Sequence, residues 1–281
     1  MSDGRRPGEG GPLSDHWRLH ARQWQHVGPP LRPSPEDVGE VERWAAAQAL
    51  ARRAPPRVLL CGVTPEIATS RWPQGTQLVA VDRNAEMISD VWPGGPESSV
   101  VRGEWLSMPL AAGAFDLVAA DGCMIHFSFP MGQREFLTAL RRVLAPGGLA
   151  IVRAFVTPEA PETAAVVAAE LRTGRIGSVH ALKWRLAMSL QSSPEVGVRL
   201  ADVFDAYERL GPLPPELASR PGFSPLACAT LEAYRGQSRT YAFPSLAGLR
   251  RILGPHFVER AIHVPQYELG ERCPTLVLEA T

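Results

Sequence analysis

The chain contains 281 residues, and its 29 lysines and arginines balance 29 aspartates and glutamates, so the formal net charge is zero. This length suits one large α/β domain with an elaboration, or two small domains. Because no basic stripe is present, a nucleic-acid backbone is not expected as the main partner. No apolar run approaches the roughly 18 residues that a membrane span needs, so no membrane association is expected.

The N-terminal residues form no apolar stretch and therefore do not resemble a secretory signal. Residues 1–14 are rich in Gly, Pro and charge, which predicts a disordered tail. Residues 15–54 are expected to form an N-terminal helical cap. It contains a short amphipathic helix over Asp15–Trp24, a Pro-rich connector, and a second helix capped by Ser34 that ends before Pro55.

The next hundred residues alternate between short apolar runs and amphipathic helices. Because the apolar runs are short and continuous, they are typical of strands buried on both faces. The alternation predicts a parallel sheet with helices on both faces over residues 55–156. Strands are expected at residues 57–61, 77–81, 99–102, 115–120 and 149–156. Helices are expected to begin at Thr64, Asn84 and Met131, the last of them ended by an Ala-Pro-Gly-Gly sequence.

This rhythm breaks over residues 157–240, where several helices are separated by Pro- and Gly-rich joints. Residues 241–281 then return to the α/β pattern, with a helix over residues 245–253 and strands over 257–264 and 274–279. The helical segment is therefore predicted to be an insertion at one edge of the sheet, where it serves as a lid over a substrate site.

The cysteines, by contrast, indicate no metal or redox chemistry. Cys61, Cys123, Cys228 and Cys273 are far apart and form neither a CxxC pair nor a zinc-ligand spacing. We expect no metal site, and four reduced thiols in a cytoplasmic protein.

The turns that follow the strands are the places to look for a site, because ligands of open parallel sheets bind at the carboxyl ends of strands. After the first strand, Gly62 allows a tight turn, Thr64 is placed as a helix cap, and Glu66 lies in the first helical turn. Any strand-to-helix turn can use a glycine, so this segment alone does not establish a ligand. Asp82 ends the second strand, at the offset where an acid bonds ribose hydroxyls, and Arg83 follows it.

Three further positions follow the third and fourth strands. Glu104 and Trp105 are placed where an adenine ring could be held, although Trp105 could equally be part of the core. Asp121 ends a buried strand, so its carboxylate needs a partner, which is either a ligand or the turn at Gly122. His126 lies shortly after it.

Taken in order, the segments VLLCGVTPEIA, LVAVDRNAEMI, VVRGEWLSMPLAAGAFDLVAADG and LRRVLAPGGLAIVRAF resemble the class I methyltransferases that use S-adenosylmethionine (SAM) on small molecules. The resemblance covers residues 57–156. It implies a Rossmann-like sheet of seven mostly parallel strands, the last inserted antiparallel. It also implies Gly62 at the methionine end of SAM, Asp82 on the ribose, Glu104 and Trp105 near the adenine, and Asp121 near the sulfonium.

The first motif departs from the family pattern, which reads acid-x-Gly-x-Gly-x-Gly. Its positions are occupied here by Leu60, Gly62, Thr64 and Glu66, so the usual acid and two glycines are replaced. We hypothesise that Glu66 or Asp121 supplies the missing carboxylate for the SAM amino group.

Acceptor contacts are expected from the N-terminal cap and the insertion. His20 and Trp24 lie one helical turn apart, and the substrate-binding candidates are completed by Lys183, Trp184 and Tyr267. The catalytic candidates are His126, Asp121 and His180, with His126 the preferred general base. A His or Trp on a helix is more often core or surface than catalytic.

The predicted function is transfer of the SAM methyl group to an O, N or C atom of a small molecule, by a monomer or homodimer. Two rivals remain at this point. One is an enzyme of the same fold that uses SAM for cyclisation or other non-methyl chemistry, and the other is a non-catalytic SAM-binding protein. A dinucleotide dehydrogenase is disfavoured because the Gly-x-Gly-x-x-Gly loop is absent.

Overall fold

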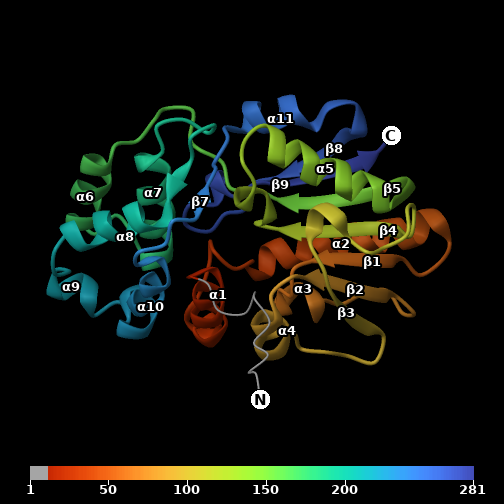
Figure 1. Ribbon diagram of the computed structural model, residues 1–281, viewed down its shortest axis with the longest axis horizontal. Coiled ribbons are helices and arrows are strands. Elements are labelled where there is room, and N and C mark those ends of the chain that lie inside the picture. Colours follow the sequence, from red (N-terminus) through yellow and green to blue (C-terminus); the bar gives the residue numbers. More distant parts are fainter. Residues whose placement is uncertain (1–11) are drawn as a thin grey trace, which may run out of the picture.

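The computed structural model describes residues 12–281, in which a Rossmann-like sheet domain lies beside a helical unit (Figure 1). Most of the tail predicted for residues 1–14 lies outside the described residues. Helix α1 (Pro12–Arg22) already includes the last three positions of that predicted tail.

The main sheet has seven strands in the order β3-β2-β1-β4-β5-β9-β8. Strands β1 to β5 are parallel, and β9 runs antiparallel to both of its neighbours. The predicted fold class is therefore confirmed, including the antiparallel insertion of the last strand. The strands are β1 (Arg57–Cys61), β2 (Gln77–Asp82), β3 (Ser98–Arg102), β4 (Phe115–Asp121), β5 (Leu144–Arg153), β8 (Phe257–His263) and β9 (Thr275–Ala280).

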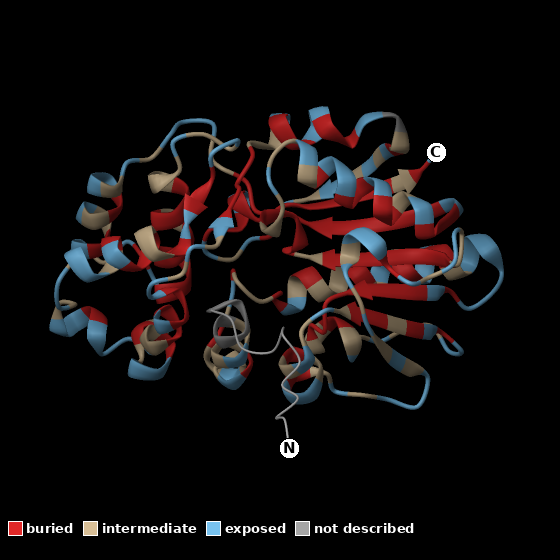
Figure 2. Cartoon of the chain, viewed as in Figure 1, coloured by how far each residue is buried: buried red, intermediate tan, exposed pale blue. Residues whose placement is uncertain are grey.

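Apolar side chains on both faces of the central strands form two cores, as Figure 2 shows by the almost continuous burial of the sheet. Because successive side chains of a strand point to opposite faces, Val58 and Leu60 pack on the face covered by α2, whereas Leu59 and Cys61 pack on the face covered by α5. The helices around the sheet are α2 (Pro35–Arg52), α3 (Pro65–Ala68), α4 (Ala85–Val91), α5 (Met131–Val143) and α11 (Leu246–Leu253).

Helix α2 begins where the sequence predicts. The Ser34 side chain accepts from the Asp37 backbone N–H, and the Asp37 carboxylate accepts from the Ser34 N–H, which forms a capping box. The predicted end of α5 is confirmed, because the helix ends at Val143, just before the Ala-Pro-Gly-Gly sequence. The start of the next strand needs a correction, because β5 begins at Leu144 rather than Leu149 and includes that sequence.

The insertion has its own apolar core, built around the buried helix α7. Its helices are α6 (Ala164–Arg172), α7 (Val179–Leu190), α8 (Leu200–Arg209), α9 (Pro215–Ala218) and α10 (Pro225–Ala229). A two-stranded antiparallel sheet, β6 (Val198–Arg199) and β7 (Thr240–Tyr241), is present as well and was not predicted. Short 3-10 helices in the chain are η1 (Trp24–His26), η2 (Trp105–Ser107), η3 (Cys123–His126), η4 (Pro221–Phe223), η5 (Thr230–Tyr234), η6 (Gly254–His256) and η7 (Gly270–Arg272).

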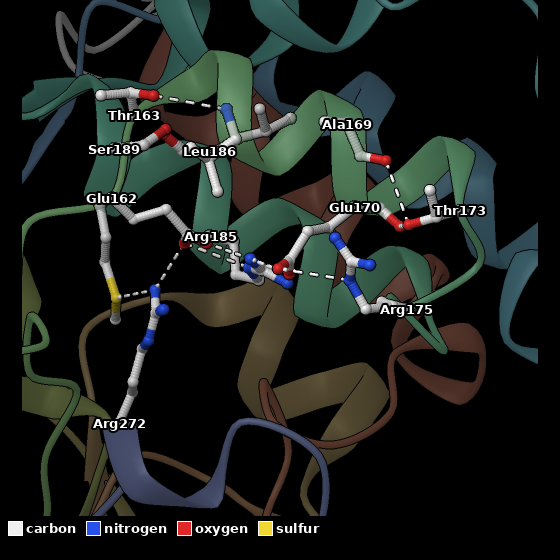
Figure 3. A network of polar contacts seen from close by, with 12 residues as sticks. Glu162, Thr163, Ala169, Glu170, Thr173, Arg175, Arg185, Leu186, Ser189 and Arg272 are labelled. Atoms are coloured by element: carbon white, nitrogen blue, oxygen red, sulfur yellow. Dashed lines mark hydrogen bonds and ion pairs between the residues drawn. The ribbon is translucent and has the colours of Figure 1, made fainter.

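A network of arginines and carboxylates ties the insertion to the sheet domain (Figure 3). The Glu162 carboxylate accepts from Arg185 of α7 and from Arg272 of η7, 3.0 Å away, and Arg185 also bonds Glu170 of α6 at 2.6 Å. Burial works to raise the pKa of Glu162, but the two guanidinium groups together hold it below its ordinary value. Helix α1 forms a second connection, because it contacts both α4 and η5.

Candidate functional site

Two adjoining clefts open at the carboxyl ends of the strands, beside the point where the strand order reverses between β1 and β4. Together with the open space at their mouths, they have volumes of about 680 and 500 Å³. The first cleft is lined by Trp17, His20, Trp24, Leu31, Cys61, Gly62, Val63, Thr64, Asp82, Met87, Trp105, Asp121, Gly122, Ile125, His126, Phe155, Trp184, Tyr234 and Tyr241. The second is lined by Trp17, Asp82, Arg83, Asn84, Gly103, Glu104, Trp105, His126, Phe127 and Arg239.

Gly62 forms the floor of the first cleft. Its φ of +93° lies where other residues are strained, and an added Cβ would stand 3.7 Å from the Trp105 ring and 3.9 Å from the Asp82 carboxylate. Its backbone N–H donates to the Val81 carbonyl at 2.8 Å, which turns the chain sharply at the end of β1. Thr64 also lines this cleft, but its side chain makes no capping hydrogen bond to α3, contrary to the prediction.

Asp82 borders both clefts. Its Oδ1 accepts from the Asn84 backbone N–H at 2.8 Å, and the Asn84 side chain in turn caps α4. Burial raises the pKa of Asp82 to about 6, although the Asn84 N–H acts in the opposite direction. The carboxylate is thus ionised at neutral pH and faces Gly62. Arg83 and Glu104 border the second cleft and form a loose pair at 3.4 Å.

Trp105 stands where the two clefts meet. Its Nε1 donates to the Val81 carbonyl at 2.7 Å, and this bond holds the indole beside Gly62. The ring also packs near His126 and Phe127, with centroid distances of 6.1 and 6.3 Å. Trp105 thus packs against other rings and also lines both clefts, so contact with a ligand stays a prediction.

Asp121 borders the first cleft, and its carboxylate is paired with Arg153, whose Nε lies 2.5 Å from Oδ1. Burial raises the pKa of Asp121, and Arg153 offsets this effect only in part. An added Cβ on Gly122 would meet the Phe155 ring at 2.8 Å, so this turn needs glycine. The partner that a buried carboxylate requires is thus a protein side chain.

His126 of η3 borders both clefts and is surrounded by aromatic rings. The centroid of Tyr241 lies 5.1 Å from its ring and that of Trp17 lies 5.6 Å away. His20 and Trp24 also border the first cleft and pack edge to face at 5.6 Å, although Trp24 belongs to η1 rather than to α1.

Four predicted residues lie outside the lining of both clefts. His180 Nε2 lies 3.0 Å from the His26 carbonyl, and burial lowers the pKa of His180 to about 4. Lys183 is fully buried beside Thr230, and burial lowers its pKa to about 7. Tyr267 contacts Arg153 and Asp37, and Glu66 is bonded by Arg32. Of the three candidates on α7, Trp184 is the one that lines the first cleft.

Sequence reasoning missed several residues that border the clefts, among them Trp17, Tyr234, Tyr241 and Arg239. Arg239 precedes β7, its guanidinium lies over the Trp17 ring at 5.4 Å, and its buried Nη1 has no hydrogen-bond partner. The two-residue strands β6 and β7 carry too little periodicity to be predicted, so nothing in the sequence pointed to these positions. Trp17 could have been found, because it lies one turn before His20 and Ala21 on the predicted helix.

Within residues 12–281 no group of His, Cys, Asp or Glu side chains is arranged to hold a metal ion. In the same part of the chain, no helix has the length and apolar character needed to cross a bilayer. All four cysteines are free, and three of them are buried.

Residues 59–152 match a family model described as a methyltransferase domain. This segment runs from within β1 to within β5 and includes the turns after β1, β2, β3 and β4. Over these residues the chain matches a methyltransferase domain, and the resemblance predicted from the sequence is confirmed to that extent. SAM is the cofactor of that class. Among curated proteins, none matches the sequence.

The fold also resembles solved structures of low sequence identity. A Rhodobacter sphaeroides protein provisionally named a Zn-dependent alcohol dehydrogenase is 14% identical, with a TM-score of 0.61 over 98% of this chain and 100% of that chain. The 1,6-didemethyltoxoflavin-N1-methyltransferase of Burkholderia thailandensis is 14% identical, with a TM-score of 0.48 over 99% and 93%. The N-methyltransferase NodS of Bradyrhizobium japonicum is 10% identical, with a TM-score of 0.47 over 95% and 98%. At 14% identity the Rhodobacter likeness shows a shared fold and nothing about chemistry.

Proposed function

We propose that this protein transfers the methyl group of SAM to an O, N or C atom of a small molecule, with the adenosyl group held beside Gly62 and Asp82. The observation that carries the proposal is the turn itself. Gly62 turns back at the end of β1 with no side chain, and the ionised Asp82 carboxylate faces the space that a Cβ would otherwise fill. This arrangement lies at the strand-order reversal, where open α/β sheets bind ligands.

The residues present fit an adenosyl group. Asp82 keeps Oδ2 available to accept from ribose hydroxyls, because its Asn84 bond uses Oδ1. In the second cleft, the Trp105 ring supplies an aromatic surface, and the buried Nη1 of Arg239 lacks a hydrogen-bond partner that a ligand could provide. Gly103, Glu104 and Arg83 complete the polar side of this cleft.

The amino end of SAM has a less obvious partner, because Leu60 replaces the acid of the family motif. Asp121 is already paired with Arg153. Glu66 bonds Arg32 through Oε1, while its buried Oε2 has no hydrogen-bond partner. The free oxygen favours Glu66 over Asp121 as the replacement, although Glu66 lies outside the lining of both clefts.

When bound, SAM supplies an electrophilic methyl carbon, to which an acceptor lone pair bonds while the C–S electron pair returns to sulfur. The protein's part is then mainly positioning, which can supply roughly 7–11 kcal/mol of barrier reduction. For an acceptor that must lose a proton, we assign His126 as the base, because it borders both clefts. The rings of Tyr241 and Trp17 hold the imidazole in place.

The test is a product assay with SAM labelled in the methyl group and small-molecule fractions as acceptor. The proposal expects S-adenosylhomocysteine and a labelled product in equal amounts. It also expects His126→Gln to lower kcat by about 10²–10⁴-fold for an acceptor that loses a proton. A different SAM-derived product would support the non-methyl alternative, and tight SAM binding without any product would support a non-catalytic binding protein.

A further inference from the structure

One wall of the first cleft, here called its cap side or aromatic wall, is formed by aromatic rings. Its rings come from the N-terminal segment, from the end of β5 and from the insertion, namely Trp17, Trp24, Phe155, Trp184, Tyr234 and Tyr241. Several of them pack on one another, with centroid distances of 5.0 Å between Phe155 and Trp184 and 6.0 Å between Trp184 and Tyr241. Only 20 of the 281 residues are aromatic, so six in one wall mark a surface suited to a flat ring.

Charge is scarce in this cleft. Of its lining residues, only Asp82 and Asp121 carry a formal charge, apart from any protonated histidine, and the Asp121 carboxylate is already paired with Arg153. An anionic acceptor would find no lysine or arginine on the lining and would lie near the Asp82 carboxylate. A cationic acceptor would lie beside the sulfonium of SAM and be repelled by it. Both arguments favour an acceptor without net charge.

Two hydrogen-bond donors in this wall have no acceptor. The indole Nε1 atoms of Trp24 and Trp184 are buried and make no hydrogen bond, and the Trp184 side chain is only 2% exposed. An unsatisfied buried donor destabilises the protein, so these two N–H groups are expected to bond a ligand. The matching ligand atoms are carbonyl oxygens or ring nitrogens.

We propose that the methyl acceptor is an uncharged planar aromatic molecule that carries a carbonyl oxygen or a ring nitrogen, bound against Trp24 and Trp184. This inference rests on the proposed function, since the aromatic wall of the first cleft is taken as the acceptor site and its floor at Gly62 and Asp82 as the adenosyl site. It names the substrate class that the cap side of the cleft selects.

Three matched probes test the proposal on the whole protein, with affinities measured by calorimetry in the presence and absence of S-adenosylhomocysteine. Coumarin is planar and neutral with a carbonyl, coumarin-3-carboxylate adds an anion to the same rings, and octahydrocoumarin keeps the carbonyl but is not flat. We expect coumarin to bind saturably and at least about tenfold more tightly than either of the other two, since a tenfold ratio corresponds to only 1.4 kcal/mol. Tighter binding of the carboxylate, equal binding of the saturated molecule, or no saturable coumarin binding would overturn the proposal.

Variants then test the two indoles. Trp24→Phe and Trp184→Phe keep a ring but remove the N–H, and each is expected to weaken coumarin binding about 3- to 10-fold. Trp44→Phe is the matched control, because the Trp44 Nε1 is also buried without a partner but lies in the core between α2 and the sheet. Equal affinity in all four proteins would contradict the assignment of the two indoles. If S-adenosylhomocysteine fails to bind while coumarin still binds, the proposed function fails and the aromatic site stands.

Discussion

The Asp121 carboxylate and the Arg153 guanidinium form a buried ion pair that joins the ends of β4 and β5, where the two residues are register partners. Arg153 also donates to the Pro30 carbonyl at 2.8 Å and lies 4.0 Å from the Asp37 carboxylate. The Arg153 guanidinium therefore compensates the charge of two buried carboxylates and also binds the connector before α2. We therefore propose that Asp121 orders the strand ends that border the cleft and does not act as a catalytic base at neutral pH.

Removing the cation from this cluster should be costly. Arg153→Met leaves Asp121 and Asp37 buried without a counter-charge, so we expect a loss of about 3–5 kcal/mol in the free energy of unfolding at neutral pH. The loss should shrink at acidic pH, because protonation then removes the uncompensated charge of Asp121. Urea unfolding at the two pH values measures both effects. Arg250→Met, which breaks only the exposed pair with Glu259, should cost less than about 1 kcal/mol.

Asp82 should make cofactor affinity depend on pH. Its pKa of about 6 means that the carboxylate is ionised above this pH and protonated below it. The affinity for S-adenosylhomocysteine should therefore be constant above about pH 6 and fall below it. Asp82→Asn should weaken binding at pH 7.5 by about 10- to 100-fold, the value of a charged hydrogen bond, and should abolish this pH dependence. If Asp82→Asn retained the wild-type affinity, Asp82 would have no role in binding the cofactor.

The same carboxylate should reduce stability. Its folded pKa of about 6 is above the ordinary value of 3.8, so the folded state binds more protons between these values, and stability falls as pH rises through them. Asp82→Asn removes this penalty and should stabilise the protein at pH 7 by on the order of 2–3 kcal/mol. Loss of affinity together with a gain in stability would show that the carboxylate is kept for binding.

The strands were predictable because each is buried on both faces and appears as a short apolar run. The lining of the clefts was predictable only where a single turn after a strand places the residue, as at Gly62 and Asp82. The Asp121–Arg153 pair could not be predicted, because it depends on the register of β4 against β5, which shifts between Phe115 and Leu117. The four-residue spacing of His180 and Trp184 placed them on one side of α7. It could not tell that Trp184 reaches the cleft while His180 packs against the His26 carbonyl.

The sequence predicts that Lys183 binds substrate, whereas the structure places it outside the lining of both clefts. It is fully buried with a pKa of about 7, and no carboxylate bonds its ammonium. Its folded pKa lies below the ordinary 10.5, so the unfolded state binds more protons and stability rises with pH between 7 and 10.5. Lys183→Met should stabilise the protein by on the order of 2–4 kcal/mol at pH 7 and much less near pH 10.5. Its affinity for coumarin should match the wild type; a large loss would return Lys183 to the binding site.

Glu162 should hold the insertion against the sheet domain. Glu162→Gln leaves the guanidinium groups of Arg185 and Arg272 without their shared carboxylate, at a cost of about 3 kcal/mol for a pair so little exposed. Hydrogen exchange should then speed up in α6 and α7 before it does in the central strands. Glu232→Gln, which breaks an exposed pair with Arg235, is the control. Unchanged exchange in α6 and α7 would show that apolar packing alone holds the insertion.

The most direct measurement is a calorimetric titration of the whole protein with S-adenosylhomocysteine, repeated for Gly62→Ala and Gly113→Ala. Both glycines have positive φ, but a Cβ at Gly113 meets nothing within 4 Å, whereas one at Gly62 points to Trp105 and Asp82. We predict single-site binding that Gly62→Ala weakens at least about tenfold, or 1.4 kcal/mol, and that Gly113→Ala leaves unchanged. Absence of binding to the wild-type protein, or equal binding by both variants, would contradict an adenosyl site at the end of β1.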